Sequence, residues 1–190
     1  MRWMKHSRLE GQHAFLGASK HAWTNYDDDK LTESYYNFLA TQKGTKLHAI
    51  AADLIQEKIL LPKKKLTFNM YVNDAIGYDL RPEQILYYSD NCFGTADAIG
   101  FDERKGDLRI HDLKTGLNPA SIHQLEIYAA LFFLEYDLPM NDINMELRIY
   151  QNNDILIEHP TVEDIAPIMD KIITFDEIIE QIKKESGYDT

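Results

Sequence analysis

An aspartate and a lysine in the middle of the sequence share one face of a predicted strand. Over residues 108–114, strand alternation places Asp112 and Lys114 on one side and His111 on the other. A carboxylate and an ammonium group so placed could hold a divalent cation and offset the charge of a phosphate. The same spacing is common in solvated surface pairs, so this pair alone is weak evidence for catalysis.

A predicted turn brings a second carboxylate to this pair. Residues 102–107 are typical of a tight turn, and a turn centred between Arg104 and Lys105 sets Asp97 directly against Asp112. Two opposed carboxylates repel each other and destabilise a sheet. Either one is protonated or a cation binds both, and a hard ion such as Mg²⁺ or Mn²⁺ suits oxygen ligands best. The pattern therefore predicts a metal site on a β-hairpin.

The same residues belong to recognisable motifs. Residues 94–97 (Gly-Thr-Ala-Asp) followed by residues 112–114 (Asp-Leu-Lys) resemble the split core motif of the PD-(D/E)xK nuclease superfamily. Gln124 and Tyr128 resemble the Q-x3-Y motif of its RecB-like branch, and the helix that carries His48 resembles the first motif of that branch. Phage recombination exonucleases and the nucleases of CRISPR spacer acquisition belong to this branch. The similarity spans about residues 44 to 128.

The resemblance implies a role for each matching residue. The implied metal ligands are one imidazole, two carboxylates and one backbone carbonyl, from His48, Asp97, Asp112 and Leu113. Lys114 would orient or activate the attacking water. Gln124 and Tyr128, one helical turn apart on one face, would hold the DNA strand or Lys114 in place. Asp97, Asp112, Lys114, Gln124 and Tyr128 are thus the expected catalytic residues.

The sequence departs from the family pattern in three respects. Ala96 stands where the superfamily name has proline, a common change in the RecB-like branch. Ala51 and Ala52 follow His48 by one turn and offer no carboxylate, which favours one well-bound ion over two. Cys92 is the only cysteine, so neither an iron–sulfur cluster nor an intramolecular disulfide is expected.

The remaining elements predict an α/β fold. We expect helices over residues 31–39, 46–60, 67–80, 118–136 and 161–184, and strands over residues 85–89, 93–101, 108–114 and 145–150. In the helix from Asn118, the asparagine would act as N-cap and Pro119 as first residue. The order matches a restriction-endonuclease-like αβββαβ core, with a mixed central sheet flanked by helices, a helical N-terminal segment and a long C-terminal helix.

Length and composition indicate one domain of 190 residues, divided into a helical N-terminal segment (1–43), a catalytic core (44–157) and a C-terminal helix (158–190). No apolar run is long enough to span a membrane, so no membrane contact and a cytoplasmic location are expected, host cytoplasm if the protein is phage-encoded. The net charge of −11 argues against a broad basic surface, so contact with nucleic acid should be narrow and local.

The preferred interpretation is a Mg²⁺- or Mn²⁺-dependent DNA nuclease. Exonuclease action in phage or bacterial recombination and repair is favoured, because no separate sequence-reading module is present. The expected partners are linear DNA ends or single strands and a recombination or single-strand-annealing protein, and the pattern is compatible with a homo-oligomer. Two alternatives stay open: a non-cleaving module that binds nucleic acid or protein on the nuclease fold, and an RNA nuclease of the same fold.

Overall fold

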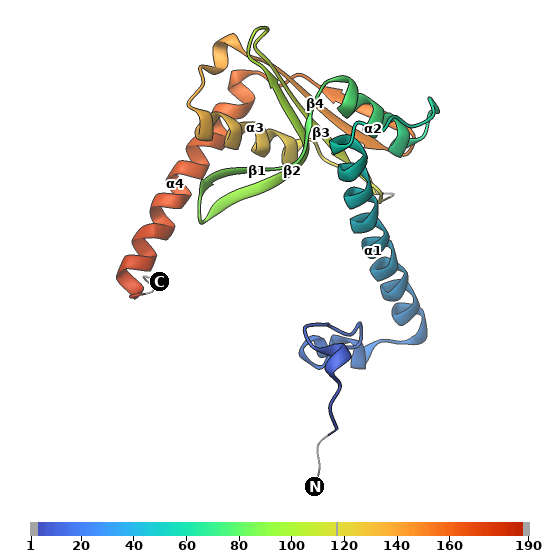
Figure 1. Cartoon of the computed structure of the whole chain (residues 1–190). Coiled ribbons are helices and arrows are strands. Elements are labelled where there is room, and N and C mark those ends of the chain that lie inside the picture. Colours follow the sequence, from blue (N-terminus) through green and yellow to red (C-terminus); the bar gives the residue numbers. More distant parts are fainter. Residues whose placement is uncertain (1–3, 117, 188–190) are drawn as a thin grey trace. The chain divides into compact units, whose positions relative to one another are not determined.

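The computed structural model describes residues 4–116 and 118–187 (Figure 1). The chain divides between Lys46 and Leu47 into two compact units, each treated by itself below. Helix α1 (Asp28–Gln56) is one continuous helix where the sequence predicted two segments. Among the described residues, no helix combines the length and hydropathy that a membrane span requires. The single-domain assignment stays a prediction.

The first unit consists of helical turns and the N-terminal part of α1. Two 3-10 helices, η1 (Ser7–Leu9) and η2 (Ala18–Asn25), precede α1. The ring of Phe15 packs edge-on against Tyr35, with 5.1 Å between the ring centroids. The indole Nε1 of Trp23 donates a hydrogen bond of 3.0 Å to the carbonyl oxygen of Gly17.

The second unit is built on a mixed sheet of five strands. In spatial order these are β1 (Arg81–Ser89), β2 (Cys92–Asp102), β3 (Asp107–Leu113), β4 (Asn144–Gln151) and β5 (Asp154–Glu158). Only β3 and β4 pair in parallel, and the 3-10 helix η3 (Met140–Asp142) and helix α3 (His123–Tyr136) form the crossover that a parallel pair needs. The α/β class and the order helix, three strands, helix, strand are confirmed. The sequence did not predict β5.

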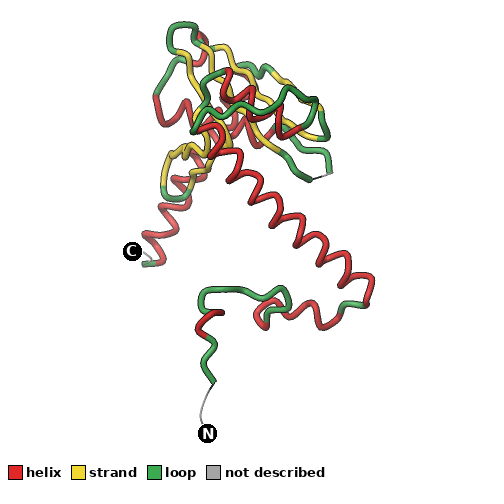
Figure 2. Tube along the Cα trace, turned by 45° about the vertical axis from the view of Figure 1, so that its right-hand side comes forward, coloured by secondary structure: helices red, strands yellow, loops and turns green. Residues whose placement is uncertain are grey.

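Helices cover both faces of this sheet (Figures 1 and 2). Helices α3 and α4 (Val162–Ser186) pack on one face, around buried residues such as Leu131 and Ile165. Helix α2 (Thr67–Gly77) and the C-terminal turns of α1 pack on the other, around Tyr71 and Ile55. Alternation along β3 explains this division, since Leu108 and Ile110 face α3 and Leu113 faces α2.

The β1–β2 hairpin separates from β3 halfway along β2. Pairing of β2 with β3 runs only from Asp102 to Ala98, whereas pairing of β2 with β1 continues to the hairpin tip. In Figure 1 the distal part of this hairpin passes under α3 towards α4. Gly94 permits this close approach, because a Cβ there would lie 2.9 Å from a ring carbon of Tyr128. The separation leaves a fork in the sheet at Asp97.

One predicted helix start is wrong, at a place where a side chain distant in sequence binds the backbone. Helix α3 begins at His123 rather than near Asn118, and Gln151 bonds the backbone of the loop before it, accepting from Ala120 N and donating to the carbonyl of Asn118. Helix α2 begins at Thr67 as predicted, and there Asn153 accepts the N–H of Thr67. These contacts have no local sequence signal.

The apolar side of α4 is buried only in the first half of the helix. Ile165 is fully buried, but Phe175 and Ile182 are 59% and 57% exposed. The reason is geometric, since α3 has 14 residues and α4 has 25, so α3 cannot cover the whole length. The N-terminus of α4 is stabilised by a capping box between Thr161 and Asp164.

Candidate metal centre

Asp97 lies in the fork where β2 leaves β3. The register of β2 on β3 follows from the predicted turn, with Ile99 opposite Ile110, but pairing ends at Ala98 and His111, so Asp97 and Asp112 do not form the predicted strand pair. Beyond that pair, the Asp97 carboxylate enters the gap and its Oδ2 accepts the backbone N–H of Leu113 at 2.9 Å. Asp97 therefore closes the fork with a side-chain hydrogen bond where the backbone ladder has ended.

His48 reaches the same carboxylate from α1. Its Nδ1 lies 3.2 Å from Oδ2 of Asp97. The hydrogen bond to Asp97 raises the pKa of His48 above its usual range, while burial acts in the opposite direction. The imidazole of His48 on α1 and the carboxylate of Asp97 on β2 are therefore close enough to contribute nitrogen and oxygen ligands to one metal ion.

Glu83 completes this cluster, and the sequence analysis did not identify it. The ligand atoms of His48, Glu83 and Asp97 all lie within 4.8 Å of one another. Burial, and secondly the charge of Asp97, raise the pKa of the Glu83 carboxyl. The sequence predicted a strand only from residue 85, whereas β1 begins at Arg81, so Glu83 was assigned to no element. Its neighbours Pro82 and Gln84 pair with Ala98 and Ala96 of β2, so Glu83 lies level with Asp97.

Asp112 is the buried carboxylate of the site, with 2% of its surface exposed. Lys114 Nζ lies 3.1 Å from Oδ1 and donates to it. Oδ2 is 3.0 Å from the same nitrogen but outside hydrogen-bond geometry, so no described donor satisfies this buried oxygen. Burial, and secondly the charge of Asp97, raise the pKa of Asp112 to about 6, against the opposing influence of Lys114. The two aspartates thus interact unfavourably, as their predicted opposition implies.

A chain of hydrogen bonds links Lys114 to α3. Lys114 Nζ donates to Oε1 of Gln124 at 2.8 Å, and Nε2 of Gln124 donates to the hydroxyl of Tyr128 at 3.0 Å. Tyr128 rests against Gly94 on β2. These contacts connect Tyr128 and Gln124 to the ammonium group that lies beside Asp112.

Leu113 can contribute to the site only through its backbone. Its side chain is 1% exposed and lies in the core on the α2 side of the sheet. Its N–H is already bound to Asp97. The backbone carbonyl is the group that the family resemblance assigns to the metal.

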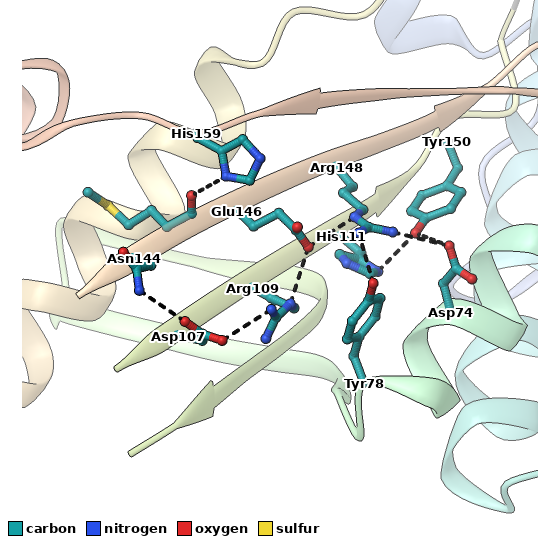
Figure 3. A network of polar contacts seen from close by, with 11 residues as sticks. Asp74, Tyr78, Asp107, Arg109, His111, Asn144, Glu146, Arg148, Tyr150 and His159 are labelled. Carbon is teal, nitrogen blue, oxygen red and sulfur yellow. Dashed lines mark hydrogen bonds and ion pairs between the residues drawn. The ribbon is translucent and has the colours of Figure 1, made fainter. Parts of the chain in front are cut away.

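His111 belongs to a different polar network on the α2 side of the sheet (Figure 3). Its Nδ1 lies 3.3 Å from the hydroxyl of Tyr150, which donates to Asp74. Burial, and then the charges of Arg148 and Arg109, lower the pKa of His111 to about 3. His111 faces away from the carboxylates, as strand alternation predicted.

The residues of the fork fit a hard divalent cation. Two carboxylates and one imidazole, from Glu83, Asp97 and His48, lie at ligand spacing. Asp112 lies outside that group but close enough for the charge of Asp97 to raise its pKa, and its buried Oδ2 has no described donor. Mutually repelling carboxylates with an unsatisfied oxygen are the arrangement that a cation stabilises. The structure thus brings together His48, Asp97, Asp112 and Lys114 as the sequence suggested, and it adds Glu83.

Comparison with known proteins adds no family assignment. No family model matches the chain, and no curated protein matches it significantly. What is established is an α/β fold with a mixed five-stranded sheet and a cluster of acidic residues and histidine at its fork.

Proposed function

We propose that this protein is a Mg²⁺- or Mn²⁺-dependent nuclease that hydrolyses phosphodiester bonds in DNA. The observation that carries the proposal is the sheet fork, where Asp97, the buried Asp112 and Lys114 meet. Carboxylates for a cation beside a lysine for a phosphate are the minimum set for metal-assisted phosphodiester hydrolysis. The αβββαβ element order and the motif resemblance to the RecB-like PD-(D/E)xK nucleases support it.

Each residue of the fork has a distinct task in this mechanism. His48, Glu83, Asp97, Asp112 and the Leu113 carbonyl would hold the cation, which when bound polarises the scissile phosphate and lowers the pKa of water. Lys114 then orients the attacking water and offsets the negative charge that develops on the phosphate. Gln124 and Tyr128 keep the ammonium group of Lys114 in position through their hydrogen bonds.

Exonuclease action on linear ends is our preferred form of the activity, in recombination or repair in the cytoplasm. A second candidate is a non-cleaving binding module on the same fold. The net charge of −11 favours this second candidate, because a surface poor in cations holds a phosphate backbone weakly. The closely placed carboxylates favour catalysis. Opposed acidic groups destabilise the fold, so a chain that binds no cation would have no reason to retain them.

The test is cleavage of matched substrates with Mg²⁺ or Mn²⁺. Linear and circular DNA, each single- and double-stranded, and a single-stranded RNA of the same sequence are incubated with wild type, Asp112→Asn and Lys114→Ala. Wild type is expected to degrade linear DNA only, and both variants are expected to lose at least about 100-fold in rate, comparable to losing one transition-state contact.

Glu103→Gln serves as the control, because it removes an acidic charge from the exposed turn between β2 and β3. It should cleave like wild type. Absence of cleavage of every DNA by wild type, while Mn²⁺ still binds, would overturn the nuclease in favour of the binding module. Cleavage of the RNA but of no DNA would instead support an RNA nuclease of the same fold.

A further inference from the structure

The β1–β2 hairpin carries exposed apolar side chains on the side turned away from α3. Ile85, Tyr87 and Phe93 are 55%, 45% and 62% exposed, and Thr95 is exposed as well. Helix α3 covers the other side of the hairpin (Figure 1), where Leu86 is buried. Tyr87 pairs with Phe93 across the two strands. Ile85 pairs with Thr95 beside them, and these four side chains form one surface, called the outer face.

The outer face adjoins the candidate metal centre. On β1, Glu83 precedes Tyr87 by four residues, and on β2, Asp97 follows Phe93 by the same number. His48 meets both carboxylates from α1, on the side of the sheet opposite α3. At about 3.3 Å per strand residue, the two rings lie roughly 13 Å along the hairpin from the carboxylates. A DNA strand that follows the hairpin from the cation reaches the rings within about four stacked nucleotides, at about 3.4 Å each.

Contacts on the opposite side of the hairpin keep the outer face exposed. The backbone N–H of Tyr87 donates to Oε2 of Glu135 on α3 at 2.9 Å. At the hairpin tip, Asn91 Nδ2 donates to Asp176 on α4 at 2.8 Å, and it also donates to Glu180 at 2.6 Å. The hairpin therefore cannot turn the outer face towards α3 and α4 without breaking these bonds.

The charges on the hairpin favour bases over phosphates as the partner of the outer face. From residue 84 to residue 95 the only charged side chain is Asp90, whose Oδ1 accepts a hydrogen bond of 3.0 Å from the hydroxyl of Tyr87. Contact with phosphates requires cationic side chains, which this stretch does not have. An aromatic ring, by contrast, stacks on any base. In a duplex the bases stack on one another, so only an unpaired strand offers its bases to Tyr87 and Phe93.

We propose that the outer face binds an unpaired stretch of DNA next to the metal centre, with its bases stacked on Tyr87 and Phe93. The inference rests on the proposed nuclease function, and it adds that the DNA held there is single-stranded. Ile85 contributes apolar contact area beside the rings. The position of the outer face favours substrate over a protein partner, because a protein bound there would lie in the path of a strand that leaves the cation along the hairpin.

The first test compares the affinities of single-stranded and duplex DNA. Fluorescence anisotropy in Mn²⁺ measures binding of a strand of about 12 nucleotides, and of the blunt duplex of equal length, to the full chain with Lys114→Ala, which prevents cleavage. The single strand should bind at least about tenfold more tightly. Adding Phe93→Ala should weaken its binding about fivefold or more, as expected for one stacked base. Phe175→Ala removes a 59% exposed phenylalanine on α4 and should leave the affinity unchanged.

Two further measurements report stacking directly. Phe93→Trp keeps an aromatic ring, so it should bind the single strand at least as tightly as the parent, and its added indole emission should be quenched. A strand of abasic nucleotides keeps every phosphate and lacks every base. This strand should bind the parent at least about tenfold more weakly than the normal strand does.

Three results would overturn the inference: equal affinity for single strand and duplex, an affinity that Tyr87→Ala/Phe93→Ala leaves unchanged, or equal binding of the abasic strand. These measurements need no cleavage, so they separate the inference from the proposed function. Binding that depends on Phe93, without cleavage by wild type, would support the outer face and reject the nuclease. Cleavage by wild type, with no effect of Phe93→Ala on binding, would reject the outer face alone.

Discussion

At the scale of single residues, Asp112 links pH to stability. Its pKa is about 6 in the folded protein, against an ordinary value of 3.8 for an exposed aspartate, so the folded state binds this proton more tightly than the unfolded chain. The stabilisation is therefore complete below about pH 4 and is lost as the pH rises through about 6. The difference corresponds to roughly 3 kcal/mol.

We expect metal-free Asp112→Asn to be more stable than wild type at pH 8 and no more stable at pH 4. Urea unfolding in EDTA at both pH values measures this difference. Saturating Mn²⁺ should reverse the order at pH 8, because only the wild type retains the ligand. An equal difference at both pH values would mean that the Asp112 carboxyl has an ordinary pKa.

Replacement of Glu83 tests whether this residue is one of the cation ligands. Glu83→Gln keeps the shape of the side chain and removes its charge, so Mn²⁺ affinity should fall about tenfold or more, the range seen even for partners around metal ligands. Isothermal titration calorimetry measures this affinity, with Glu103→Gln as the control for general loss of negative charge. Unchanged affinity in Glu83→Gln would restrict the ligand set to the residues that the sequence indicated.

Sequence reasoning reached those residues that carry a local signal. Asp97, Asp112 and Lys114 could be brought together because alternation and one turn determine a hairpin register. His48 and the Gln124–Tyr128 pair required the motif resemblance. Glu83 could not be found in this way, because its left-handed backbone (φ 50°) and its place in β1 depend on pairing with β2.

At the scale of elements, a series of contacts links the β1–β2 hairpin through α3 to Lys114. In Gly94→Ala the new Cβ would meet Tyr128 at 2.9 Å, so the ring must move and its bond to Gln124 is disturbed. We expect the cleavage rate to fall about 10- to 100-fold, as small displacements of catalytic groups do. Single-turnover rates measure the effect.

Gly77→Ala is the matched control, since a Cβ at Gly77 meets no heavy atom within 4 Å. It should leave the rate unchanged, and thermal unfolding should show that both variants remain folded. A Gly94→Ala variant as fast as wild type would show that Tyr128 is not needed to hold Lys114.

The elements themselves were predictable where hydrophobic period and turn residues agree, as in β2, β3 and the start of α4. They were not predictable where distant side chains decide the outcome. An example is Gln151, which binds the backbone of the loop before α3, a helix that begins later than the sequence predicted. The exposed half of α4 was not predictable either. Apolar spacing predicts which face of a helix packs, but not how long the helix that covers it is.

At the scale of the whole molecule, acidity should limit contact with DNA to the fork. Each phosphate that a protein neutralises adds about −0.9 to the slope of log affinity against log salt. The chain has 20 basic and 31 acidic residues, so it should neutralise few phosphates. For Lys114→Ala bound to linear DNA in Mn²⁺, we expect the slope of log affinity against log salt to be no steeper than about −4. Fluorescence anisotropy over a salt series measures it, and a slope beyond about −6 would indicate a wide basic surface.

The left-handed backbone at Glu83 also affects which substitutions are favoured at this position during evolution. A non-glycine residue in that conformation costs of order 1–3 kcal/mol, and Glu83 has φ 50° as a member of the cluster with His48 and Asp97. Glycine at this position would relieve the strain and strengthen the fold, yet it would remove a carboxylate from the cluster. Selection for folding alone therefore favours losing Glu83, and its retention among homologues would be a sign that cation binding is under selection.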